Sequence, residues 1–138
     1  MWRIELMPWE SARAHAAPIR VRVFVDEQGV PPELEMDEAD AGCIHAVAFD
    51  GARAIATGRL LPDGHIGRMA VLREFRGQGL GGAILEKLVE TARSRGQREA
   101  LLSAQVHALA FYRAHGFEAL GEAYDEAGIA HQAMRRAL

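Results

Sequence analysis

Four glycines stand within seven residues at positions 76 to 82, where the chain reads RGQGLGG. Apolar residues then recur at helical spacing from Leu80 to Ala92, which predicts an amphipathic helix that ends near Gly96. A helix that begins in a glycine-rich turn presents free backbone N–H groups and its positive dipole end to a phosphate. The stretch therefore predicts a turn that binds a phosphate-bearing molecule, and the question is which one.

Two common phosphate-binding motifs do not fit this stretch. A triphosphate-binding P-loop needs a lysine directly after its last glycine, and Lys87, the one lysine of the chain, lies elsewhere. The dinucleotide motif G-x-G-x-x-G is matched by Gly77, Gly79 and Gly82. However, residues 72–76 separate these glycines from the preceding strand, and the next strand ends in SAQ rather than in an acidic residue.

The remaining patterns predict an α/β fold with a mixed sheet in one domain, residues 1–138. Turn residues at 50–51 and 62–64 join three strand candidates into an antiparallel meander. A Rossmann sheet would need parallel crossovers instead. The expected strands cover residues 2–7, 43–50, 52–61, 65–72, 99–105, 117–124 and 131–138. The order after the meander is helix, strand, helix and two strands.

Two N-terminal expectations concern a proline and an acidic segment. Residues 11–28 have a helical pattern, and Pro18 is expected to split it into two pieces. Residues 29–42, GVPPELEMDEADAG, are expected to form a proline-containing acidic loop, and its acidic part, residues 33–40, is expected to be solvated.

Charge and cysteine content exclude several classes of protein. The net charge of −3 and pI near 6.1 argue against nucleic-acid or membrane binding. Cys43 is the single cysteine, so it is expected to be a buried apolar residue rather than half of a disulfide. The N-terminal segment lacks the apolar core of a signal peptide. A cytoplasmic location is therefore expected.

Two motifs together resemble the GNAT family, the GCN5-related N-acetyltransferases. Arg76, Gly79 and Gly81 form Arg-x-x-Gly-x-Gly, which is similar to the acyl-CoA pyrophosphate site of that family. Residues 107–117, HALAFYRAHGF, are similar to its C-terminal helix and the strand that follows. Residues 19–40 and 121–136 resemble a bacterial subgroup of small acetyltransferases whose substrates are largely unassigned. The resemblance implies the GNAT fold and acetyl-CoA as cosubstrate.

The resemblance also implies a set of CoA-binding residues. The loop from Arg76 to Gly82 would hold the pyrophosphate, and the strand segment before it would pair with the pantetheine arm and polarise the thioester carbonyl. The expected CoA contacts are Met69, Ala70, Val71, Arg76, Gly77, Gln78, Gly79, Leu80, Gly81 and Gly82. No metal is expected, because the six histidines show no ligand spacing.

Acyl transfer to an amine also requires an acid and a base. Tyr112 is the predicted acid, because a phenol can donate a proton to the thiolate while remaining neutral at pH 7. Its neighbour Phe111 is expected to be a core aromatic. Glu27, at the end of the second helical piece, is the predicted base. Four other candidates remain open, namely Glu35, Asp37, Asp40 and His131.

The sequence thus predicts an N-acetyltransferase that moves an acyl group from acetyl-CoA to a primary amine of a small molecule or peptide, by direct attack in a ternary complex. The alternative is a non-catalytic module that senses acyl-CoA, since both would share every anchoring residue. The acceptor, the acyl chain length and a possible homodimer are left open.

Overall fold

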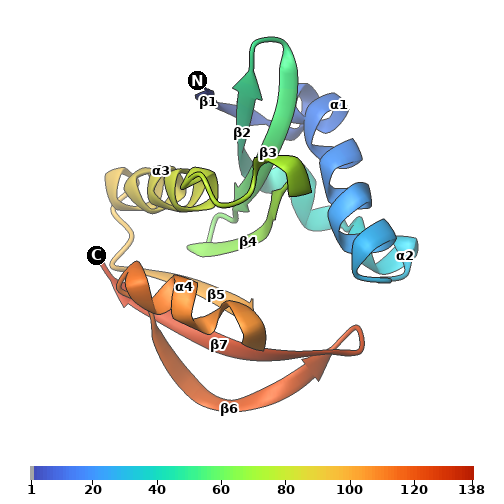
Figure 1. The fold of residues 1–138 in the computed structure, drawn as a ribbon. Coiled ribbons are helices and arrows are strands. Elements are labelled where there is room, and N and C mark those ends of the chain that lie inside the picture. Colours follow the sequence, from blue (N-terminus) through green and yellow to red (C-terminus); the bar gives the residue numbers. More distant parts are fainter. Residues whose placement is uncertain (1) are drawn as a thin grey trace.

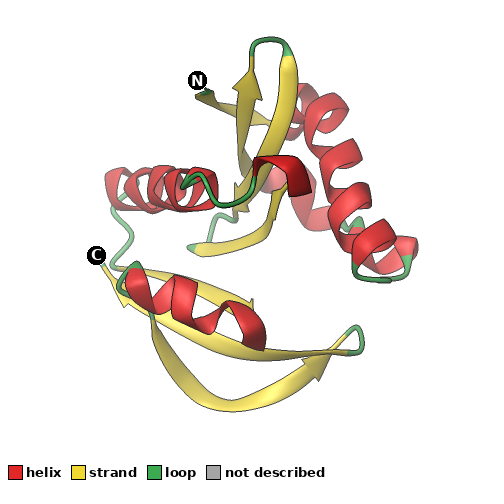
Figure 2. Cartoon of the chain, viewed as in Figure 1, coloured by secondary structure: helices red, strands yellow, loops and turns green. Residues whose placement is uncertain are grey.

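Turns at Gly51 and Gly64 make three successive strands antiparallel neighbours, as expected from the sequence. The computed structural model describes residues 2–138, and its seven strands form one mixed sheet in the order β1-β2-β3-β4-β5-β7-β6 (Figures 1 and 2). The strands are β1 (Arg3–Pro8), β2 (Ile44–Asp50), β3 (Arg53–Leu60), β4 (His65–Val71), β5 (Glu99–Gln105), β6 (Glu118–Glu126) and β7 (Ile129–Ala137). The predicted meander and the predicted α/β class are confirmed.

Four α-helices and four short helical segments connect the strands. The α-helices are α1 (Trp9–Arg20), α2 (Pro32–Glu35), α3 (Leu80–Ser94) and α4 (Leu109–Ala114). The π-helix η1 (Val21–Glu27) follows α1, and the 3-10 segments are η2 (Glu38–Gly42), η3 (Arg73–Phe75) and η4 (Val106–Ala108). No helix in the described part of the chain has the length and apolar character to cross a membrane.

The expected break at Pro18 is wrong. Helix α1 starts at Trp9, runs through Pro18 to Arg20, and continues without interruption into η1. Proline cannot donate the hydrogen bond that a helix interior needs, so the backbone is weakened just before it widens into the π-helical turn. The helical segment therefore extends from Trp9 to Glu27, which brings Glu27 to the far end of one long element.

Strand β3 is buried from Ile55 to Leu60 because helices cover both of its faces. A Cβ added at Gly58 would lie 2.9 Å and 3.0 Å from Ile84 and Leu88, so one face packs directly on α3. The adjacent Arg59 points the other way and bonds to Asp40, which also bonds to Arg20 of α1. Strands β2 to β4 therefore lie between α1 and α3.

Strands β4 and β5 pair over two positions only, His65 with Leu101 and Ile66 with Leu102. Just beyond, the β3–β4 register shifts between Thr57 and Arg59, and Arg68 of β4 has a left-handed φ of 50°. From there β4 diverges from β5, so the sheet separates into a β1–β4 part and a β5–β7 part (Figure 1). This divergence positions the candidate active site.

Candidate active site

A cleft of about 980 Å³ opens where β4 and β5 diverge. Its walls come from η1, β4, β5, α4 and β7, and from the start of α3. Six of the predicted site residues line this cleft: Met69, Ala70, Val71, Arg76, Gly81 and Tyr112. Because β4 has no ladder partner on this side beyond Ile66, the backbone of Met69–Val71 is available to a ligand that enters the cleft.

The glycine loop, residues 76–82, needs its glycines for backbone conformation and for close packing. Gly77 and Gly79 have φ values of 79° and 81°, which side-chain-bearing residues rarely adopt. Gly79 directly precedes α3, so the free N–H groups of the first helical turn begin at Leu80. A Cβ at Gly82 would lie 2.9 Å from Nε2 of His115, so Gly82 permits packing against the end of α4.

Arg76 is held by two elements before any ligand binds. Its Nε donates to the backbone oxygen of Val71 at 2.9 Å, and its Nη2 donates to both oxygens of Glu27 at 3.1 Å and 3.0 Å. Arg73 also donates to Glu27, at 3.4 Å. The guanidinium of Arg76 is therefore oriented from the end of β4 and from the end of η1.

Glu27 and Tyr112 line different pockets. Glu27 lines a smaller surface pocket of about 560 Å³ together with Arg22, Asp26, Arg73 and Glu74, and it is absent from the lining of the large cleft. Its carboxylate is engaged by two arginines. The role of Glu27 as base stays a prediction, and these contacts indicate a role in holding Arg76.

Tyr112 projects from α4 into the cleft wall. Its ring packs edge-on against Phe111 and Phe117, with centroids 5.0 Å and 6.0 Å away. Burial raises the pKa of Tyr112 to about 12, so its phenol stays protonated at neutral pH. The expectation for Phe111 is wrong: it is 37% exposed and lines the cleft beside Gly81 and Val71. A short helix at the cleft edge cannot bury both aromatic side chains.

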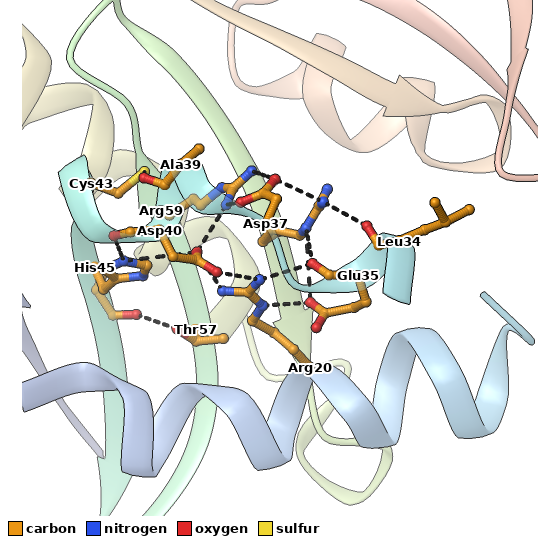
Figure 3. A network of polar contacts seen from close by, with 12 residues as sticks. Arg20, Leu34, Glu35, Asp37, Ala39, Asp40, Cys43, His45, Thr57 and Arg59 are labelled. Carbon is orange, nitrogen blue, oxygen red and sulfur yellow. Dashed lines mark hydrogen bonds and ion pairs between the residues drawn. The ribbon is translucent and has the colours of Figure 1, made fainter. Parts of the chain in front are cut away.

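The expected solvated acidic loop is also wrong. Glu35 and Asp40 are each 2% exposed, because they lie against the buried guanidinium of Arg20 (Figure 3). Arg20 donates to Glu35 at 2.5 Å and to both oxygens of Asp40 at 2.8 Å and 3.0 Å. A run of acidic residues is usually exposed to solvent, because buried carboxylates need cationic partners. Here the partner is Arg20 of α1, which lies outside the acidic segment.

The same cluster reaches the cleft, which is lined by Glu35, Asp37, Arg59 and Arg68. Hydrogen bonds from Arg59, at 2.7 Å and 2.9 Å, lower the pKa of Asp37 to about 2 although partial burial opposes this. Arg68 donates from Nε to the backbone oxygen of Glu35 at 3.0 Å. We call these six side chains the arginine–carboxylate cluster: Arg20, Glu35, Asp37, Asp40, Arg59 and Arg68.

This cluster ties the segment between α2 and η2 to the bulge of β4, one residue before Met69. The carboxylates of Glu35, Asp37 and Asp40 all accept hydrogen bonds from arginines. Their observed partners therefore favour a structural role for these three base candidates.

A hydrogen bond crosses the cleft at the ends of two elements. Nε2 of Gln105, the last residue of β5, donates to Oε1 of Gln28, just after η1, at 2.8 Å. No sequence pattern marks either glutamine as part of a site. His131, the remaining base candidate, lines the cleft from β7 and is 7% exposed.

The divergent β4–β5 pair, the glycine loop before α3 and the tyrosine of α4 together define an acyl-CoA-dependent acyltransferase of the GNAT type. The family model described as "Acetyltransferase (GNAT) domain" matches residues 12–138. The chain therefore belongs to the GNAT acetyltransferase family, as the two sequence motifs predicted.

Individual relatives agree with this assignment. The chain is 38% identical to the "uncharacterized N-acetyltransferase YjcF" of Bacillus subtilis, over 86% of this chain and 87% of that protein. A crystal structure of an acyl-CoA N-acyltransferase from Pseudomonas aeruginosa has a TM-score of 0.90 and 31% identity, covering 99% of this chain and all of that one. A GNAT acetyltransferase from Elizabethkingia anophelis, solved with acetyl-CoA bound, shares the fold at a TM-score of 0.75 and 17% identity, over 98% of each chain.

Proposed function

We propose that this protein is an N-acetyltransferase of a single domain, residues 1–138, which transfers the acetyl group of acetyl-CoA to a primary amine. The observation that carries the proposal is that one cleft is lined by the unpaired edge of β4, the glycine loop and Tyr112. Acetyl-CoA was solved bound to the Elizabethkingia acetyltransferase of the same fold, which supports the choice of cosubstrate.

The cosubstrate is anchored along the glycine loop and β4. Backbone N–H groups from Gly77 to Gly82 receive the pyrophosphate, and Arg76 adds a charged donor that is already oriented by Val71 and Glu27. Nε and Nη2 of Arg76 are engaged, so its Nη1 is the group that meets the phosphate. The pantetheine arm pairs with Met69–Val71, where a backbone N–H polarises the thioester carbonyl.

The transfer itself is a direct attack. The amine nitrogen bonds to the thioester carbonyl carbon, the carbon–sulfur bond breaks, and the thiolate leaves as the thiol of CoA. Tyr112 supplies the proton to the departing sulfur, because its phenol is neutral at pH 7 and lies in the cleft wall. No covalent intermediate on the protein is needed, and the buried thiol of Cys43 bonds to the backbone oxygen of Ala39 instead.

The proposed acceptor is the primary amine of a small molecule or of a peptide. The cytoplasmic location expected from the sequence stays a prediction. Thiol release from acetyl-CoA, measured with and without spermidine, glucosamine and a lysine-containing peptide, tests the activity. Amine-dependent thiol release with matching N-acetylated product supports the enzyme. Tight acetyl-CoA binding without turnover on any amine would instead indicate a non-catalytic sensor of acyl-CoA.

A further inference from the structure

On the β5–β7 wall of the cleft, four polar side chains converge at one level of three adjacent strands. His131 of β7 pairs in register with Gln105 of β5 and with Tyr124 of β6, so these side chains share one face of the sheet. Ser103 lies two residues before Gln105 and therefore on the same face. Tyr124 reaches across β7, and its hydroxyl hydrogen-bonds to the hydroxyl of Ser103.

This arrangement determines which nitrogen of His131 carries the proton. Nδ1 lies 2.7 Å from the backbone oxygen of Ile129, and because a carbonyl oxygen can only accept, Nδ1 must donate. Neutral His131 therefore has its lone pair on Nε2. The ring is held in place by Tyr124, which stacks on it at a centroid distance of 6.2 Å and an interplanar angle of 27°.

Nε2 of His131 lies near the solvent-exposed carboxylate of Glu126. It lies 3.5 Å from Oε2 of Glu126, whose side chain is 54% exposed while that of His131 is 9% exposed. A proton accepted by Nε2 is stabilised by this carboxylate and can pass from there to water. The large cleft is therefore lined both by Tyr112 of α4 and by three residues of the β5–β7 wall, namely Ser103, Glu126 and His131.

We propose that His131 is the general base of the reaction, with Glu126 as the group that stabilises its protonated form. As the amine nitrogen bonds to the carbonyl carbon, its proton moves to Nε2 of His131, while Tyr112 protonates the departing sulfur. Glu126 accepts the hydrogen bond of the resulting imidazolium, and solvent removes the proton. This inference rests on the proposed acetyltransferase function and adds the residue that activates the amine.

Other titratable and charged groups also line the cleft, among them His65, whose Nδ1 lies 3.0 Å from Oδ2 of Asp63. His107 of η4 lines the cleft on the same side, and Tyr124 of β6 is occupied by Ser103. On the opposite wall, the three carboxylates of the arginine–carboxylate cluster are paired with its three guanidinium groups, so the charges of that cluster balance. Glu27 lies outside the cleft lining.

The kinetic test compares native protein with His131→Gln and Glu126→Gln, using acetyl-CoA and the fastest of the three amine probes named above. For His131→Gln we expect kcat/KM to fall about 100-fold or more, and any rise of kcat/KM with pH that the native protein shows should disappear, because the base is lost. For Glu126→Gln the rise of kcat/KM with pH should persist and kcat/KM should fall less than in His131→Gln, because the base itself is retained. His15→Gln, on α1 against Phe49, is the matched histidine control and should keep the native profile.

A native-like pH profile in His131→Gln, with turnover intact, would overturn the role of His131 and leave the acetyltransferase function standing. Absence of amine-dependent turnover by the native protein would overturn both. A second measurement needs no turnover: nitrogen NMR spectra of isotope-labelled histidine should show His131 with its proton on Nδ1 when neutral. A proton on Nε2 would contradict the proposed geometry.

Discussion

Glu27 and Arg76, 49 residues apart, form a two-oxygen ion pair, in which Nη2 of Arg76 donates to both carboxylate oxygens of Glu27. The pair joins the end of η1 to the start of the glycine loop. Val71 accepts from Nε of the same guanidinium, so Arg76 is oriented from two sides. The long helical segment from Trp9 to Glu27 thereby holds Arg76 through Glu27, while Val23 and Phe24 of the same segment line the large cleft.

Glu27→Gln separates this orienting role from the role of general base. We expect KM for acetyl-CoA to decrease by up to about fivefold, because a negative charge beside the CoA phosphates is lost while the amide oxygen still accepts from Arg76. The rise of kcat/KM with pH should remain. Its disappearance in steady-state kinetics would make Glu27 the base and refute the assignment to His131.

Tyr112→Phe removes the proposed proton donor and keeps the aromatic packing against Phe111 and Phe117. We expect kcat to fall about 100-fold, since the thiolate must leave unprotonated or take its proton from water. The Kd for acetyl-CoA, measured by titration calorimetry, should change less than about twofold, because the phenol acts on the departing sulfur. Unchanged turnover would remove Tyr112 from the mechanism.

Gly81→Ala tests the CoA site without disturbing the fold. A Cβ at Gly81 would meet Phe111 and Val71 at 3.7 Å, an ordinary contact, and alanine is a better helix former than glycine. We therefore expect native or slightly higher thermal stability. Gly81 lines the cleft, so the added methyl should weaken acetyl-CoA binding about tenfold or more. Native affinity in a stable variant would place the pyrophosphate elsewhere.

Arg20→Ala should destabilise the protein strongly, by about 3–5 kcal/mol, because it leaves Glu35 and Asp40 buried without their main cationic partner. Urea unfolding monitored by circular dichroism gives this value. The matched control is Glu5→Ala, which removes the exposed partner of Arg3 and should cost no more than about 1 kcal/mol. Equal effects of the two changes would show that the cluster contributes nothing particular to stability.

The lowered pKa of Asp37 implies that the free energy of unfolding decreases at acidic pH. The folded-state pKa of Asp37 is about 2, below the usual aspartate value of 3.8, chiefly because Arg59 hydrogen-bonds to its carboxylate. The pair therefore contributes its full stabilisation above about pH 4 and loses it as the pH falls toward 2. Asp37→Asn should be less stable at neutral pH and should lose less stability over this interval. Parallel curves of unfolding free energy against pH for the two proteins would contradict the assignment.

Much of the candidate CoA site could be predicted because its signals are local. Glycines with left-handed φ, at 77 and 79, can be recognised from residue type alone, and so can the helix that follows them. The hairpin turns at Gly51 and Gly64 likewise specify neighbouring antiparallel strands. The motif around Tyr112 is equally compact in sequence.

The acidic segment and Pro18 show why other predictions failed. The burial of Glu35 and Asp40 depends on Arg20 and Arg59, which arrive from α1 and β3. The helix continues through Pro18 because its buried face, including Ala12, Ala16 and Ile19, packs on the sheet. In both cases the partner lies elsewhere in the sequence: the arginines for the acidic segment, and the sheet for the helix that contains Pro18.

The sequence by itself determined the fold class, the meander, the glycine loop and the family, since each rests on backbone preferences or motifs confined to a few neighbouring residues. Only the tertiary structure decided that Glu27 holds Arg76, that the acidic segment is buried, and that His131 lies beside Glu126. Those relationships depend on distances between side chains from separate elements, and these distances exist only after β4 and β5 diverge and the helices pack on the sheet.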